Sequence, residues 1–323
     1  MNKSNNILIT GITGQDGIFL ASLFLKNSNK NIYGLSRNVN SKIFYDRLRN
    51  ILAFDKSRIK ILNTELLDKK LVKKLLEEVQ PEAIFNLSGP SSVNESFKNS
   101  NLSKEIKLIF ENLTSSLIEL NNFCFFFQAS SSEMFGKNHT KYLNEESEMI
   151  PNSPYALAKY DNHNLCKKYF EEFDWKIVSG IMFNHESEFR KKDFLIPKII
   201  TTAKQIKENK LDQIVLGSLD LVRDWTYAED VAIALAKLYE NSNKIESSYV
   251  IGTGKGMSIK DIINEVSLIL DIDLLKFVKV DKNILRIDDP LIRISYPEKI
   301  KSLTYWEPKT NFNEMLLKTA KLY

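Results

Sequence analysis

The chain has 323 residues, of which 43% are hydrophobic and 27% charged, and its formal net charge is +4. This size suits one large α/β domain with a smaller lobe, and the interspersed charges argue against nucleic acid as a partner. No apolar run is long enough for a membrane span or a signal-peptide core, so we expect a cytoplasmic protein with no membrane partner.

Short apolar runs alternate with longer amphipathic runs, which is typical of a parallel sheet covered by helices. Strands are predicted at 7–10, 31–35, 59–62, 83–87, 123–129, 176–183 and 214–216. Helices are predicted at 17–26, 69–79, 104–120, 155–173, 197–208 and 228–241. Two more helices are expected, one capped by Ser258 and ending near residue 270, and a last one capped by Asn311. In the helix at 69–79 we expect Leu71, Leu75, Leu76 and Val79 to face the core.

This order predicts an α/β fold with a Rossmann-type doubly wound parallel sheet and a smaller C-terminal α/β substrate lobe. We expect the cofactor domain to comprise 1–182, 219–255 and 283–302, and the lobe to comprise 183–218, 256–282 and 303–323. Two cysteines far apart, Cys124 and Cys166, indicate no disulfide framework. The three histidines have no metal-ligand spacing, so no metal is expected.

A glycine-rich loop follows the first predicted strand and opens the first helix. Gly11, Gly14 and Gly17 lie at i, i+3 and i+6. Such glycines allow a tight turn and bring backbone amides and a helix N-terminus close to a pyrophosphate. The loop therefore indicates a dinucleotide site, although an ordinary glycine-rich β–α turn would have the same spacing.

The residues after the second predicted strand favour one cofactor over another. NAD-selective folds place an acid there, whereas this chain has Ser36-Arg37-Asn38. A guanidinium suits a 2′-phosphate, so we expect NADP, unless Arg37 is only a solvated surface residue.

Hydroxyls and one carboxylate, Ser130-Ser131-Ser132-Glu133, end the fifth predicted strand. Tyr155 and Lys159 stand four residues apart on one face of the next helix. A cation beside a phenol favours the phenolate, so Tyr155 is expected to act as a base near neutral pH. Such a site can take a proton from a sugar hydroxyl while hydride leaves the same carbon. Glu133 points to chemistry beyond oxidation, unless it is a surface residue at a strand end.

Together these motifs resemble the GDP-mannose 4,6-dehydratase family of extended short-chain dehydrogenases/reductases. The resemblance spans nearly the whole chain. It rests on segments 8–17, 86–87 with Ser91, 128–133, 153–155, 183–187, 223–225 and 306–308.

The resemblance implies roles for individual residues. The catalytic residues would be Ser131, Glu133, Tyr155 and Lys159. The NADP site would contain Gly11, Ile12, Thr13, Gly14, Gln15, Asp16, Gly17, Arg37, Asn38, Glu65, Leu66, Leu87, Gly89, Ser91, Lys159, His185 and Arg190. The nucleotide-sugar site would contain Ser91, Asn184, Lys198, Arg223, Arg286 and Asp289, although Arg223 could instead be a structural ion-pair partner. A homodimer or homotetramer is implied, because the loop near Arg37 reaches a neighbouring subunit in that family.

The implied activity is NADP-dependent 4,6-dehydration of a GDP-sugar, with GDP-D-mannose as the first candidate. Ser131, Glu65 and Asp289 are conservative departures from the family pattern, whereas Pro90, Glu188 and Pro197 are larger ones. The larger departures leave open another sugar nucleotide, such as a GDP-heptose. A nucleotide-sugar 4-epimerase or 4-reductase is a second alternative, which would need Tyr155 and Lys159 but no carboxylate at position 133. A non-catalytic NADP-sensing protein on the same fold is a third.

Overall fold

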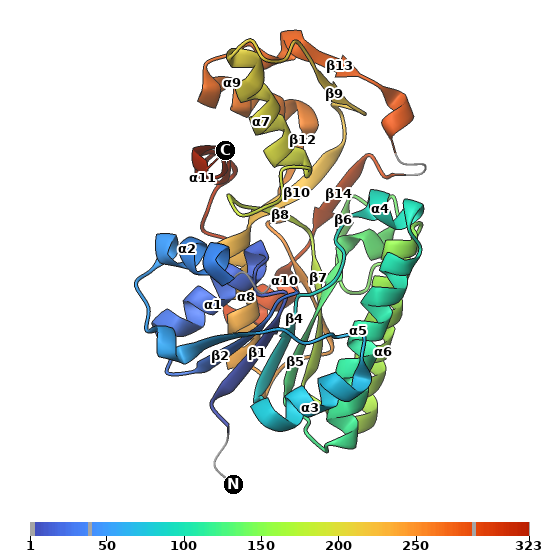
Figure 1. Cartoon of the computed structure of the whole chain (residues 1–323). Helices are drawn as coiled ribbons and strands as arrows, with labels where there is room; N and C mark the ends of the chain where they lie inside the picture. Colours follow the sequence, from blue (N-terminus) through green and yellow to red (C-terminus); the bar gives the residue numbers. More distant parts are fainter. Residues whose placement is uncertain (1–3, 38–40, 286–288, 323) are drawn as a thin grey trace.

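The structure is a computed structural model that describes residues 4–37, 41–285 and 289–322 (Figure 1). Its centre is a parallel sheet whose seven strands, within those ranges, run in the order β11-β7-β5-β4-β1-β2-β3. The strands are β1 (Asn6–Thr10), β2 (Asn31–Leu35), β3 (Ile59–Leu62), β4 (Ala83–Asn86), β5 (Phe125–Ser131), β7 (Ile177–Met182) and β11 (Ser248–Ile251). The order reverses between β1 and β4, and ligands of such sheets bind beyond the carboxyl ends of the strands at this point.

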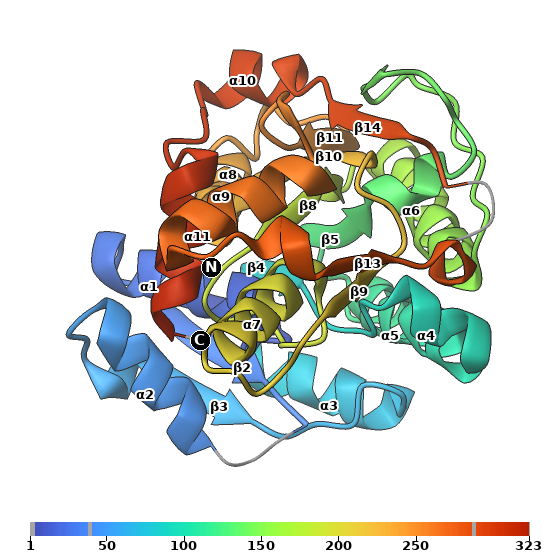
Figure 2. The same cartoon turned by 90° about the horizontal axis from the view of Figure 1, so that it is seen from above.

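Helices cover both faces of this sheet (Figures 1 and 2). On one face lie α1 (Gln15–Asn27), α2 (Ser41–Ile51), α8 (Ala228–Glu240) and α10 (Glu298–Thr304). On the other lie α3 (Lys69–Val79), α4 (Val93–Lys98), α5 (Asn101–Glu119) and α6 (Pro154–Phe173). Alternate residues of β5 point to opposite faces, so Phe125 and Phe127 pack under α1 and α8 while Phe126 packs against Phe110 and Trp175.

A smaller lobe lies beyond the carboxyl ends of the central strands (Figure 1). Its larger sheet has the order β12-β10-β14-β6, with β8 also paired to β10, and β9 pairs with β13. The strands are β6 (Tyr142–Leu143), β8 (Asn184–Glu186), β9 (Ile214–Leu216), β10 (Val222–Tyr227), β12 (Gly256–Ser258), β13 (Val278–Val280) and β14 (Ile292–Ser295). The helices are α7 (Leu195–Lys207), α9 (Ile259–Leu270) and α11 (Phe312–Leu322). Short 3₁₀ turns are η1 (Lys56–Arg58), η2 (Ser132–Phe135), η3 (Leu274–Phe277) and η4 (Lys282–Ile284).

The predicted fold class is confirmed, and the predicted bounds of β2, β3, β9 and α3 agree with the structure. Both predicted caps are present: Ser258 forms a capping box with Asp261, and the Asn311 side chain accepts a hydrogen bond from the backbone N–H of Glu314. Leu71 was wrong as a core residue, because it is 46% exposed. The buried residues of α3 are Val72, Leu75, Leu76 and Val79. They follow the i, i+3, i+4, i+7 spacing of one helix face, which starts at Val72.

The sequence pattern missed α2, α4, α10, the main-sheet strand β11 and most of the second sheet, and the predicted domain boundaries stay a prediction. In the described ranges, no helix is long and apolar enough to cross a membrane. No group of His, Cys, Asp and Glu side chains suited to a metal ion occurs in the same part of the chain. Both cysteines are buried free thiols, and burial raises the pKa of each, that of Cys124 to about 12.

Candidate active site

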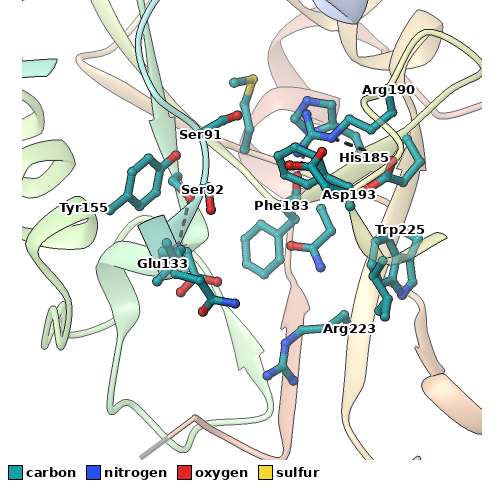
Figure 3. Close-up of a pocket in the computed structure, with 18 of the residues that line it drawn as sticks. Ser91, Ser92, Glu133, Tyr155, Phe183, His185, Arg190, Asp193, Arg223 and Trp225 are labelled. Atoms are coloured by element: carbon teal, nitrogen blue, oxygen red, sulfur yellow. Dashed lines mark hydrogen bonds and ion pairs between the residues drawn. The ribbon is translucent and has the colours of Figure 1, made fainter. Parts of the chain in front are cut away.

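A cavity of about 460 Å³ lies where the carboxyl ends of β4, β5 and β7 face β8, β10 and α7 (Figure 3). This volume is typical of small-molecule sites. Tyr155 and Glu133 lie on one wall, and His185, Arg190 and Trp225 lie across from them. The cavity therefore brings residues of the main sheet and the smaller lobe to one ligand-sized space.

The start of α6 fixes the position of Tyr155. The Ser153 side chain accepts a hydrogen bond from the backbone N–H of Ala156 at 3.0 Å, and Pro154 occupies the first helical turn. Tyr155 is buried at the cavity wall, and Ser131 is close enough to its hydroxyl to lower the pKa of Tyr155. Ser131 Oγ also accepts a hydrogen bond from the N–H of Glu133 at 3.2 Å. The cap of α6 thus holds Tyr155 next to Ser131, and Ser131 is hydrogen-bonded to the backbone of Glu133.

The sequence left open which of three serines faces the ligand. Ser130 and Ser132 are each 2% exposed, and the Ser130 hydroxyl accepts a hydrogen bond from Ser179. Ser131 is half-buried, lines the cavity and lies close enough to Tyr155 to lower the pKa of that phenol. Ser131 is therefore the hydroxyl beside the phenol.

The sequence argument for a Tyr155 phenolate near neutral pH omits the effect of burial, and the role of Tyr155 as a base stays a prediction. Burial raises the pKa of Tyr155 to about 12, although the nearby Ser131 hydroxyl and the Arg190 charge oppose that rise. Burial also lowers the pKa of Lys159 to about 8. Lys159 Nζ donates to the Ala129 carbonyl at 2.7 Å and lies 5.7 Å from the centre of the Tyr155 ring. The sequence argument counted the cation but not the cost of removing both groups from water.

Glu133 is held by an arginine that the sequence analysis did not identify. Arg293 Nη1 donates to Glu133 Oε1 at 2.8 Å, and the Arg293 side chain is 2% exposed. Its sequence signal is a charge between Ile292 and Ile294 in a short apolar run, which indicates a buried and paired side chain. Asp193, Ser92 and Trp225 were also missed as cavity residues.

Arg223 lies on the cavity wall and is paired with a carboxylate. Its Nη2 donates to Asp289 Oδ1 at 2.7 Å, and its Nη1 donates to the backbone carbonyls of Val222 and Leu291. Asp289 Oδ1 also lies 3.7 Å from Arg293 Nη2. The ion pair that the sequence analysis gave as the alternative role of Arg223 is therefore present, and its substrate contact stays a prediction.

A second charged cluster lines the opposite wall. His185 Nε2 lies 3.1 Å from Asp16 Oδ1, and Arg190 Nε lies 3.8 Å from Glu186 Oε2. Burial alone would lower the pKa of His185, but the Asp16 carboxylate reverses this effect and the net pKa is raised. Burial raises the pKa of Glu186 to about 7, against the opposing charges of Arg190 and His185. This wall carries groups of both signs near the first helix.

The glycine loop fits a dinucleotide. Gly11 has φ +66°, and a Cβ there would lie 2.8 Å from the Leu87 carbonyl oxygen. A Cβ on Gly17 would lie 2.5 Å from Ile12 Cα, so this glycine allows close packing of helix and loop. Gly14 is the N-cap residue of α1 and has no side chain that could accept a hydrogen bond. The backbone N–H groups of the first turn of α1 therefore have no side-chain acceptor at the cap. A pyrophosphate is the anion that such a helix start binds.

Not every predicted cofactor residue has a side chain suited to ligand contact. Gln15 is 4% exposed; its Nε2 donates to the His185 carbonyl and its Oε1 accepts from the Ser187 hydroxyl, so it ties α1 to β8. Ile12 is fully buried, and any contact with phosphate would come from its backbone. Arg37 is 82% exposed and lies 3.9 Å from Glu105.

The remaining predicted residues divide into three groups. Those that line the cavity are Asp16, Leu87, Gly89, Ser91, Ser131, Glu133, Tyr155, Lys159, Asn184, His185, Arg190, Lys198, Arg223 and Asp289. Those that do not line it are Gly11, Ile12, Thr13, Gly14, Gln15, Gly17, Arg37, Glu65 and Leu66. Asn38 and Arg286 lie outside the described residues.

The three larger departures from the family pattern lie in different surroundings. Pro90 lines the cavity. Glu188 lies outside it and accepts a hydrogen bond from the Tyr227 hydroxyl at 3.0 Å, and Pro197 is buried within α7. Two of the three changes are therefore accommodated by packing away from the cavity.

The chain is similar in sequence to known proteins described as GDP-mannose 4,6 dehydratase. GDP-mannose 4,6 dehydratase from Homo sapiens is 32% identical over 82% of this chain and 72% of its own length. The protein of the same description from Drosophila melanogaster is 32% identical over 79% of this chain, and the match spans 66%, just under two thirds, of the fly protein.

A solved structure and a family model complete the comparison. The dTDP-glucose 4,6-dehydratase of Bacillus anthracis, in complex with NAD, has a TM-score of 0.83 at 19% identity, covering 98% of this chain and 96% of that one, which shows the shared fold. Residues 8–319 match the family model described as GDP-mannose 4,6 dehydratase. The chain therefore belongs to the GDP-mannose 4,6-dehydratase family, on the NAD(P)-binding fold of extended short-chain dehydrogenases/reductases.

Proposed function

We propose that the protein catalyses the NADP-dependent 4,6-dehydration of a GDP-sugar, with GDP-D-mannose giving GDP-4-keto-6-deoxy-D-mannose. The observation that carries this proposal is the convergence of Ser131, Glu133 and Tyr155 on one cavity at the carboxyl end of β5. Membership of the family supports the choice of reaction. The arginine after β2 supports NADP, because Arg37 offers a cation and its neighbours in the sequence, Ser36 and Asn38, carry no carboxylate.

The first half of the reaction uses the phenol and the serine. Tyr155 accepts the proton of the C4 hydroxyl, and Ser131 donates a hydrogen bond to the same sugar oxygen as charge develops. The pKa of Tyr155 stays near 12 although Ser131 and Arg190 favour the phenolate, so the positive charge of a bound oxidised nicotinamide would have to supply further stabilisation of the phenolate. A bound nicotinamide would accept the hydride from C4 and return it to C6, and the proton that Tyr155 took from the C4 hydroxyl would be given back to the sugar at C5.

The second half uses the carboxylate. A C4 ketone makes the C5 proton acidic, and Glu133 removes that proton. The C6 hydroxyl then leaves as water with a proton supplied from the same side chain, so Glu133 ends the step ionised as it began. An epimerase or a reductase has no such step, which is why this carboxylate distinguishes the proposal from those alternatives.

The test is incubation of the purified protein with NADP and GDP-D-mannose, with the product read by mass spectrometry. We expect loss of one water and no net NADPH. Glu133→Gln should still bind GDP-D-mannose but lose turnover by a factor of about 10² to 10⁴. Glu188→Gln is the matched control, since this carboxylate lies outside the cavity, and it should retain turnover.

Other outcomes would contradict the proposal in distinct ways. A product that keeps its water but changes configuration at C4 would indicate an epimerase. Dehydration of a GDP-heptose and not of GDP-D-mannose would keep the reaction and change the substrate. Tight NADP binding with no turnover on GDP-, UDP- or dTDP-sugars would overturn the dehydratase activity altogether.

A further inference from the structure

We propose that Arg293 is a positioning residue that holds the Glu133 carboxylate for proton removal at C5 and links it to Arg223 on the cavity wall. The inference rests on the proposed function, since it concerns the second half of that reaction. Arg293 itself does not line the cavity, whereas Glu133 does, so the guanidinium supports the carboxylate from the protein side.

Arg293 donates hydrogen bonds to two residues of one turn, Glu133 and Gly136. Nη1 donates to Glu133 Oε1 at 2.8 Å, and Nη2 donates to the Gly136 carbonyl at 3.2 Å. Glu133 and Gly136 belong to the same turn, since the N–H of Gly136 donates to the Glu133 carbonyl at 3.0 Å. One rigid guanidinium therefore fixes both the carboxylate and the backbone that carries it.

The turn itself is built for this contact. Gly136 has φ +46°, and a Cβ there would collide with the backbone carbonyl of Ile150. Only glycine fits this position, and its conformation brings the carbonyl within reach of Arg293. A glutamate with several rotatable bonds gains most from such a clamp, because proton removal needs one orientation of the carboxylate.

Side chains of alternating charge connect the Arg293–Glu133 pair to Arg223 on the cavity wall. Arg223 Nη2 donates to Asp289 Oδ1 at 2.7 Å, and the same oxygen lies 3.7 Å from Arg293 Nη2. Arg223 faces the cavity, so a bound diphosphate that draws on Arg223 also acts on Asp289. The order Arg223, Asp289, Arg293, Glu133 therefore gives the substrate end of the cavity a route to the catalytic carboxylate.

The test separates the two halves of the reaction in one turnover. Loaded enzyme is mixed with substrate, the reduced nicotinamide is followed by its absorbance, and water loss is followed by mass spectrometry after rapid quenching. In Arg293→Met we expect C4 oxidation near the wild-type rate, accumulation of reduced cofactor, and product formation slowed about 100-fold. KM should change little, because Arg293 does not line the cavity.

Matched variants exclude a merely structural role. Arg58→Met removes another guanidinium bonded to backbone carbonyls, those of Leu25, Ser28 and Lys30, far from the cavity, and it should not accumulate reduced cofactor. Arg293→Lys keeps the charge but not the fork, so product formation should be partly rescued, to about tenfold below wild type. Asp289→Asn should slow the second half and weaken GDP binding, measured by calorimetry without cofactor.

Each outcome decides the matter. Equal slowing of C4 oxidation and water loss in both Arg293 variants, or product formation at the wild-type rate, would overturn the inference. Were Arg293→Met unfolded, as judged by thermal unfolding, Arg293→Lys alone carries the test with the same criteria. A wild-type protein that dehydrates no sugar nucleotide would overturn the proposed function and this inference together, whereas an active wild type with unaffected variants overturns the inference only.

Discussion

Replacement of His163 by asparagine should remove a large part of the protein's sensitivity to mild acid. His163 lies on α6 and is 3% exposed. The Ser179 hydroxyl donates to Ser130 at 2.7 Å, so its oxygen is free to accept from His163 Nδ1, which lies 2.8 Å away. The network therefore places a proton on Nδ1, and burial, which lowers the pKa of the ring, keeps Nε2 unprotonated. An asparagine amide offers a donor in a similar place but does not titrate.

The magnitude follows from linkage. Burial, helped by the nearby Lys167 charge, lowers the pKa of His163 from 6.5 to about 4. Between pH 6.5 and about pH 4, His163 binds a proton in the unfolded chain but not in the folded chain. The free energy of unfolding is therefore highest above pH 6.5 and falls as the pH falls toward 4. The shift corresponds to about 3 kcal/mol in total, of which about 2 kcal/mol is lost by pH 5.

The assay is urea unfolding of wild type and His163→Asn at about pH 7 and about pH 5. Buried carboxyls also titrate in this range, so the comparison is the difference between the two proteins at each pH. We expect wild type to lose about 2 kcal/mol more than His163→Asn. His139→Asn is the control, because His139 is exposed, and it should follow wild type. Equal losses in wild type and His163→Asn would refute the reasoning.

Three further substitutions test the loop, a cap and the cofactor choice. Gly11→Ala should lower the free energy of unfolding, measured in urea, by about 1–3 kcal/mol, because residue 11 has φ +66° and the new Cβ would contact the Leu87 carbonyl. An unchanged free energy of unfolding would mean that the loop relaxes around the new side chain. Ser258→Ala removes the capping box of α9 and should cost about 1 kcal/mol in the same assay, whereas no loss would show that the cap is redundant. Arg37→Ala should raise the Kd for NADP about tenfold in calorimetry and leave that for NAD unchanged, and equal weakening of both would argue against a 2′-phosphate contact.

Much of the main sheet and part of the site were predictable, because both depend on local patterns. Alternation of apolar runs with amphipathic ones specifies strands and helices whatever they later contact. The glycine spacing at 11, 14 and 17 is a requirement of the backbone, so it is visible without tertiary structure. Tyr155 and Lys159 share a helix face for the same local reason.

Less of the smaller lobe was predictable. Strands such as β10 and β14 lie in a mixed sheet, and their partners come from distant parts of the chain. Their polar residues, Arg223 and Arg293, interrupt the apolar periodicity that marks a strand. The same residues form ion pairs with Asp289 and Glu133, which line the cavity, so the segments with the weakest local pattern lie at the candidate site.

By itself, the sequence determined most strands and helices of the main sheet, the glycine spacing of the first loop and the positions of Glu133 and Tyr155, since each depends on spacing along the chain. Only the tertiary structure decided the partners and the electrostatic surroundings of those side chains. Arg293 and Glu133 are 160 residues apart, and their contact exists because β14 packs beside the turn after β5. The raised pKa of Tyr155 has the same origin, because desolvation depends on what the rest of the fold brings around the phenol.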